Sequence, residues 1–238
     1  MDFVFHEEMV YGKKHVNKLN YDNSKYDFRS IVEKCFKVEN LSKVHQNNPD
    51  YDVFKEFGPD VQTWYHDTFY NYLKTTDEGA NMQKIYDNLI KEVILPYLNI
   101  NEALVQKFPS FRVQLPGNIA VAKMHTDNSL GHPIGEINFT YAFTDMFDTN
   151  TIWIEKMPRL KDFVPINQEA NSITSFNANL CMHYNKLNKT GKTRMSMDFR
   201  VLPLNYYDKD KVLSSHSTKQ KFVDGGYYKL FKKICNKE

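Results

Sequence analysis

The segment KMHTDNSLGHPIGEINF contains His125 and Asp127, an imidazole and a carboxylate separated by one threonine. On a β-strand, residues two apart project from the same face, so both side chains would point in the same direction. A second imidazole from another strand would complete a facial set of two histidines and one carboxylate, which suits Fe(II). A His-x-Asp triplet also arises by chance in a chain of 238 residues with eight histidines, so the surrounding segments decide its meaning.

The segment NLCMHYNKL supplies His183, the later histidine that falls where strands are expected. Taken alone, it fits an ordinary core or surface imidazole. The next segment, NKTGKTRMSMDFRV, alternates so that Arg194, Ser196, Asp198 and Arg200 share one strand face. If that face is buried, its charges need partners, and an arginine followed two residues later by a serine offers a fork and a hydroxyl for a small carboxylate. The alternative is an outer face whose charges are solvated.

Together, the His-x-Asp, the distal histidine and an Arg-x-Ser eleven residues after it resemble the Fe(II)/2-oxoglutarate-dependent oxygenases. The resemblance runs from FRVQLPG to FVDGGYY, roughly half of the chain. Stretches such as GHPIGEINFTYAFTD, TNTIWIEK and HYNKLNKTGKTRMSMDFRVLP are most similar to the branch that contains the streptomycin-biosynthesis oxygenase.

This resemblance implies that His125, Asp127 and His183 hold Fe(II), with 2-oxoglutarate as cosubstrate and O2 as co-reactant. Arg194 would pair with the distal carboxylate of 2-oxoglutarate, and Ser196 would assist. Arg200 is the rival anchor, but the distance of Arg194 from His183 matches the family better. Asp127 stands where halogenating members have a small residue, so hydroxylation or a related oxidation is expected.

Further side chains are expected around this centre. Gln114 and Asn138 are assigned to the cosubstrate, and the expected substrate contacts are Arg112, His132, Glu155 and Arg200. Surface strand positions, a buried asparagine bonded to backbone and a structural ion pair are the alternatives for these residues.

The expected reaction is oxidation of a C–H bond in a small polar metabolite such as an amino acid, an aminoglycoside or a sugar derivative. Two other classes remain open: a carbohydrate-binding jelly roll without catalysis, and a cupin-type metal enzyme that does not use 2-oxoglutarate. The cupin would keep the histidines but would not need Arg194, so substitution of this residue discriminates between them. The carbohydrate-binding protein would bind no Fe(II) tightly.

Composition is that of an ordinary globular protein, with 41% hydrophobic and 25% charged residues and a net charge of +2. There is no basic stripe for nucleic acid and no apolar run long enough for a membrane span. The three cysteines, Cys35, Cys181 and Cys235, are far apart, which favours reduced thiols in a cytoplasmic protein. A small-molecule partner is therefore expected, and the oligomeric state is left open.

The order of elements predicts an α+β protein with a single domain over residues 1–238. Residues 1–105 read as mainly helical, with a capping box at Ser30 and Glu33 and a helix start at Gly58-Pro59. Residues 106–238 read as short alternating strands, which include NIAVAKMHTD, residues 118–127. Helices followed by such strands favour a double-stranded β-helix, or jelly-roll, core under a helical N-terminal layer.

Overall fold

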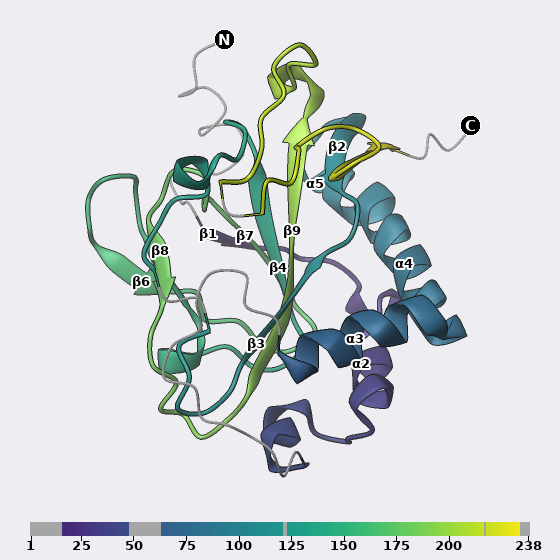
Figure 1. The fold of residues 1–238 in the computed structure, drawn as a ribbon, viewed down its shortest axis with the longest axis vertical. Helices are drawn as coiled ribbons and strands as arrows, with labels where there is room; N and C mark the ends of the chain where they lie inside the picture. The colour runs from purple at the N-terminus through teal and green to yellow at the C-terminus, as the bar shows by residue number, and fades with distance from the viewer. Residues whose placement is uncertain (1–15, 48–62, 121–122, 217, 234–238) are drawn as a thin grey trace.

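The computed structural model describes residues 16–47, 63–120, 123–216 and 218–233 (Figure 1). Its α-helices precede most of the strands in the chain: α2 Phe28–Phe36, α3 Trp64–Thr75, α4 Asp77–Leu89 and α5 Leu95–Tyr97. A π-helical segment, Ile90–Ile94, joins α4 to α5 into one rod. Short 3-10 turns occur at Asn23–Lys25, Leu41–Asn47, Asn128–Leu130, Asp148–Asn150 and Leu204–Tyr206.

The strands form two antiparallel sheets. The larger has seven strands in the order β1-β7-β4-β9-β2-β10, with β3 also paired to β9, and the smaller has the order β6-β5-β8. Their bounds are β1 Val16–Lys18, β2 Glu102–Gln106, β3 Ser110–Gln114, β4 Ile137–Ala142, β5 Ile152–Glu155, β6 Phe163–Pro165, β7 Ile173–Phe176, β8 His183–Asn185, β9 Arg194–Pro203 and β10 Tyr228–Lys232.

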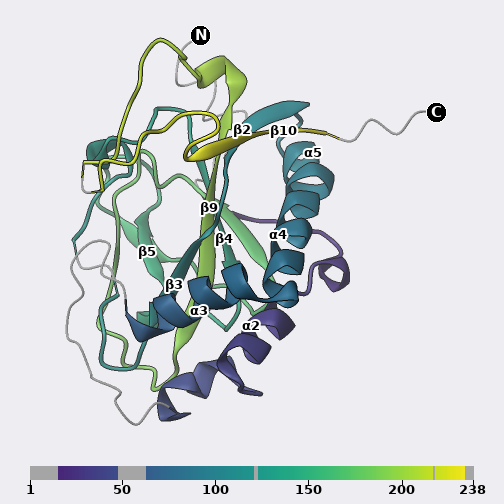
Figure 2. The ribbon, with the colours of Figure 1, turned by 45° about the vertical axis from the view of Figure 1, so that its right-hand side comes forward.

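The helices cover one face of the large sheet, and the small sheet lies on its other side (Figures 1 and 2). The helix-covered face is apolar: Met195, Met197 and Phe199 of β9 are fully buried in the main core. Phe199 stacks on Phe139 of β4 at 5.1 Å and meets Tyr86 of α4 edge-on at 5.4 Å. This layer fixes β9, and therefore the side chains on its opposite face, against the helices.

The expected α+β class is confirmed, but the expected boundary near residue 105 cuts through β2. The N-terminal part also contributes β1, which pairs with β7. Helix α2 begins before the predicted capping box, because the carboxylate of Asp27 accepts a 3.1 Å bond from the backbone N–H of Ser30. Gly58-Pro59 and Cys235 lie outside the described residues, whereas Cys35 and Cys181 are buried thiols.

The strand predicted over residues 118–127 is not found in its described residues, 118–120 and 123–127. Gly117 and Ala120 both have positive φ angles, 79° and 60°, which interrupt an extended backbone. The chain regains strand geometry at His125, which forms an isolated bridge with His183, and then enters the 3-10 turn after Asp127. Among the described residues, no helix has the length and apolar character needed to cross a membrane.

Candidate metal centre

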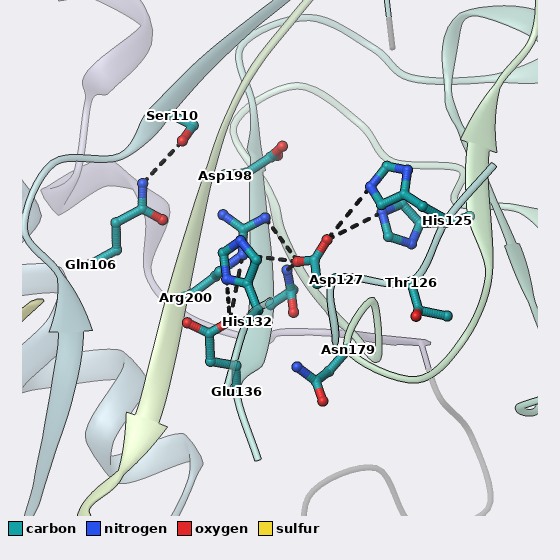
Figure 3. Close-up of polar contacts among 12 residues, drawn as sticks. Gln106, Ser110, His125, Thr126, Asp127, His132, Glu136, Asn179, Asp198 and Arg200 are labelled. Carbon is teal, nitrogen blue, oxygen red and sulfur yellow. Dashed lines mark hydrogen bonds and ion pairs between the residues drawn. The ribbon is translucent and has the colours of Figure 1, made fainter. Parts of the chain in front are cut away.

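Two imidazoles and one carboxylate converge between the two sheets (Figure 3). The Nε2 atoms of His125 and His183 lie 3.7 Å and 3.6 Å from Oδ1 of Asp127. The ligand atoms of the three residues all lie within 4.8 Å of one another, so a single ion can reach all three. This is the set that the sequence pattern predicts.

The backbone brings these residues together by a bridge and a turn, in place of the alternation of a strand. His125 and His183 exchange both hydrogen bonds of the bridge, at 3.2 Å and 2.9 Å. The N–H of Asp127 donates to the carbonyl of Ala178 at 2.8 Å, which ties the start of the 3-10 turn to the loop that leads into β8. His125 and Asp127 are therefore both hydrogen-bonded to the backbone of residues 178–183.

Each histidine is oriented through its other ring nitrogen. Nδ1 of His125 lies 2.7 Å from the carbonyl oxygen of Lys123, and Nδ1 of His183 lies 3.2 Å from that of Cys181. A carbonyl oxygen accepts only, so Nδ1 carries the proton in both rings. The lone pair of Nε2 is then free to bind a metal, which is the common arrangement in metal-binding histidines.

The charge states of the ligands also suit a metal. Burial lowers the pKa of His183 to about 4, so its imidazole is neutral near pH 7. Burial alone would raise the pKa of Asp127, but the Arg200 guanidinium, together with His132, His183 and the hydrogen bond from Asn138, holds that pKa well below its usual range. A neutral imidazole and an ionised carboxylate are the forms that coordinate cations.

The second oxygen of Asp127 is held by two side chains from the large sheet. Nδ2 of Asn138 donates to Oδ2 at 2.7 Å, and Nε and Nη2 of Arg200 lie 2.9 Å and 2.8 Å from the same atom. Asn138 and Arg200 lie directly opposite each other on β4 and β9. We expected Asn138 to contact the cosubstrate and Arg200 to bind substrate or rival Arg194; in the structure both engage the carboxylate of Asp127, and their contacts with a ligand stay a prediction.

Arg194 lies at the far end of the same face of β9, six residues before Arg200. It is only 2% exposed, and burial lowers its pKa to about 10. Its Nη1 donates to Oγ of Ser196 at 3.0 Å, whereas Nε has no hydrogen-bond partner. Within the described part of the chain, no carboxylate lies within ion-pair distance of this guanidinium, and Asp198, the acid that partly offsets its burial, is itself paired with Arg112.

Strand β3 adds Gln114 opposite Arg194 and Arg112 opposite Ser196. Nε2 of Gln114 donates to the carbonyls of Asn118 and Lys186, and the buried Oε1 of the same amide has no partner. Nε of Arg112 pairs with Oδ2 of Asp198 at 3.0 Å. Arg112 is thus engaged in an ion pair beside Arg194, which leaves Arg194 as the unpaired cation of this face.

Two expected substrate contacts have other partners. The fully buried carboxylate of Glu155 accepts bonds from the backbone N–H groups of Arg159, Lys161 and Met182, so it holds loops in place. Nδ1 of His132 lies 2.7 Å from Oε2 of Glu136, beside Asp127. These partners account for both side chains without a substrate.

Sequence reasoning did not identify Glu136, which is 1% exposed and also accepts a hydrogen bond from the Tyr228 hydroxyl. The available signal was its position four residues after His132 in a segment already singled out. Tyr227, whose hydroxyl accepts a 3.1 Å bond from Nη1 of Arg200, carried no signal in the sequence.

Comparison with known proteins extends these observations. No family model matches the sequence. The streptomycin biosynthesis protein StrG of Streptomyces griseus is 27% identical over 191 residues, which are 80% of this chain and 86% of that protein.

Among solved structures, the nickel complex of the non-heme monooxygenase ThoJ matches with a TM-score of 0.52 and 11% identity. The alignment covers 100% of this chain and 89% of ThoJ. The metal-free form of ThoJ also matches, with a TM-score of 0.52, 12% identity and coverage of 95% and 86%. The chain is therefore a sequence relative of StrG, as its motifs predicted, and it has the fold of a non-heme monooxygenase.

Proposed function

We propose that this protein is an Fe(II)/2-oxoglutarate-dependent oxygenase that hydroxylates, or otherwise oxidises, a C–H bond of a small polar metabolite. The observation that carries the proposal is the pairing of two sites on one buried face. A two-histidine, one-carboxylate group lies at one end, and the unpaired guanidinium of Arg194 lies at the other.

The residues present fit both components. His125, Asp127 and His183 would hold Fe(II) and leave the remaining positions open to cosubstrate and O2. Arg194 is a buried cation without a carboxylate partner among the described residues, and a dianion such as 2-oxoglutarate supplies one. Ser196 steadies the guanidinium through its hydroxyl, and Oε1 of Gln114, which has no partner, is available to accept a hydrogen bond in the same region.

When bound, Fe(II) with 2-oxoglutarate and O2 supplies an oxidant that removes hydrogen from a C–H bond. The protein's own residues would bind and orient the cosubstrate and the substrate, and they would exclude water from the site. Arg194 would fix the tail of the cosubstrate, and the buried setting strengthens that interaction because water does not compete. Asp127 leaves no vacant ligand position for a halide, which favours oxygenation over halogenation.

The charges of this region fit a dicarboxylate cosubstrate, and the relationship to StrG supports a small substrate. The six charged side chains of this region are three arginines, Arg112, Arg194 and Arg200, and three acids, Asp127, Glu136 and Asp198, so they balance. A divalent ion then adds two positive charges, which a dicarboxylate neutralises. The name of StrG, a streptomycin biosynthesis protein, supports a metabolite such as an aminoglycoside or sugar derivative. An amino acid stays within the same proposal.

The two facing sheets fit a double-stranded β-helix core, and the shared hydrophobic core of helices and large sheet fits one domain. A cytoplasmic location, a small-molecule partner and the absence of nucleic-acid and membrane partners belong to the same proposal.

The deciding experiment is anaerobic absorption of the protein with Fe(II), titrated with 2-oxoglutarate. We expect a weak visible charge-transfer band in the wild type, its loss or alteration in Asp127→Ala, and a much higher 2-oxoglutarate requirement in Arg194→Ala with metal binding retained. Iron uptake without a band would indicate a cupin-type enzyme instead. No uptake at all would leave a carbohydrate-binding protein.

A further inference from the structure

Arg200 lies between two buried carboxylates (Figure 3). Its Nε and Nη2 contact Oδ2 of Asp127 at 2.9 Å and 2.8 Å, and Nε is 3.8 Å from Oε2 of Glu136. Asp127 and Glu136 are 2% and 1% exposed. A buried carboxylate needs a cation or several donors nearby, and one guanidinium serves both of these acids.

The side chains around Arg200 have the composition of a metal site. Asp127, His132 and Glu136 each offer a ligand atom, and these atoms lie within 4.8 Å of one another. This second group shares Asp127 with the group formed by His125 and His183. Carboxylates that bridge two neighbouring ions are a common basis of two-metal sites.

The two oxygens of Asp127 face different sides. Oδ1 lies toward the imidazoles of His125 and His183, and Oδ2 lies against Arg200 and Asn138. An ion bound by the second group would need the Oδ2 side, which the guanidinium already fills. A guanidinium and a divalent ion held this close together in a buried site repel each other strongly, so Arg200 and a second metal ion exclude each other.

We propose that Arg200 acts as a built-in cation that closes this second carboxylate–imidazole site and so keeps the metal centre mononuclear. Arg200 is then a positioning residue that holds Asp127 in place and confines metal coordination to Oδ1. This inference rests on the proposed function for the identity of the first metal, but it concerns the number of ions that the protein binds.

The test is the stoichiometry of Co(II) binding, measured anaerobically by equilibrium dialysis and elemental analysis, with folding followed by circular dichroism. We expect one ion per chain for the wild type and for Arg200→Lys, which retains the charge. Arg200→Ala removes the guanidinium beside Asp127 and Glu136 and opens space between these acids, so this variant is expected to bind two Co(II) ions per chain. Arg200→Ala combined with Glu136→Gln should return to one.

Arg112→Ala is the matched control, because it removes the arginine of the neighbouring ion pair with Asp198 on the same face. It is expected to bind one ion. Two ions in the wild type, one in folded Arg200→Ala, or two in the combined variant would each overturn the inference while leaving the first metal site intact. If Arg200→Ala does not fold without metal, Arg200→Gln, which removes the charge but keeps hydrogen-bond donors, replaces it: two ions would uphold the proposal and one would contradict it. No ion in the wild type would instead contradict the proposed function.

Discussion

The imidazole rings of His125 and His183 lie 4.4 Å apart between centroids because the two residues are joined by both backbone hydrogen bonds of a single bridge. A metal site built on a backbone pairing does not depend on long, flexible side chains to find its geometry. The rigidity of this pair predicts that the site exists before metal arrives.

Replacement of His183 by alanine is expected to weaken Co(II) or Fe(II) binding at least about 100-fold, because one of three ligands is lost. The fold should persist, since the ring is neutral and its removal leaves no buried charge. Isothermal titration of the metal-free protein measures this. His216→Ala, which removes an exposed histidine, is the control, and equal affinity in both variants would contradict the assignment.

Arg194→Met is expected to raise the dissociation constant for 2-oxoglutarate by about 10-fold to 150-fold, the range for losing a charge-assisted hydrogen bond of about 1.5–3 kcal/mol. Metal affinity should not change, because Arg194 touches no ligand of the candidate site. Titration of the metal-loaded protein with 2-oxoglutarate gives both quantities. A larger loss in Arg112→Met than in Arg194→Met would move the anchor to Arg112.

The stability of the metal-free protein should fall as pH decreases below about 6.5. The folded-state pKa of His183 is lowered by burial to about 4, so the unfolded chain takes up this proton first and is favoured as pH falls between these two values. His66, whose pKa burial also lowers to about 4, contributes in the same direction. Asp127, with a folded-state pKa below its usual range, adds a further loss below about pH 4.

Urea unfolding at pH 7.5, 5.5 and 4.5 measures this dependence. The His183 contribution is of the order of 3 kcal/mol across the window, and His183→Gln should reduce the slope accordingly. An unchanged slope in this variant would refute the assignment of the pH dependence to His183. Bound metal should shift this loss of stability to lower pH, because the metal competes with protons for the same ligands.

The apolar layer between the helices and the large sheet is expected to contribute most to the free energy of unfolding. Phe199 is fully buried between Phe139 and Tyr86, so Phe199→Ala is expected to destabilise the fold by about 3–5 kcal/mol. Leu230→Ala on β10, at a site 38% exposed, should cost far less. Chemical denaturation of both variants makes the comparison, and equal losses would show that the helix–sheet layer is not the main core.

The sequence pattern singled out the three residues of the candidate metal group, which the structure brings together. Alternation along β9 also places Arg194 and Arg200 on one face, as the structure shows. The sequence pattern did not anticipate that Arg200 would meet Asp127, since that contact depends on how a turn far away in the chain docks on the sheet. The strand expected through His125 is absent from residues 118–120 and 123–127, because the backbone has positive φ angles at Gly117 and Ala120, which hydrophobic alternation does not report.

Glu155 gives the last contrast between pattern and structure. It was expected to contact the substrate, yet its carboxylate accepts backbone donors at 3.2 Å, 2.9 Å and 2.8 Å from Arg159, Lys161 and Met182. Glu155→Gln replaces one acceptor oxygen by a donor, so at least one of these N–H groups loses its partner.

The expected result for Glu155→Gln is faster amide hydrogen exchange in residues 156–162 and at Met182, with metal and 2-oxoglutarate affinities close to those of the wild type. Met182 directly precedes His183, a proposed metal ligand, so both affinities are measured beside the exchange rates. A fall in 2-oxoglutarate affinity with unchanged hydrogen exchange would instead place Glu155 in the binding pocket. Because the two measurements respond to different roles of one carboxylate, they separate loop anchoring from ligand contact at this position.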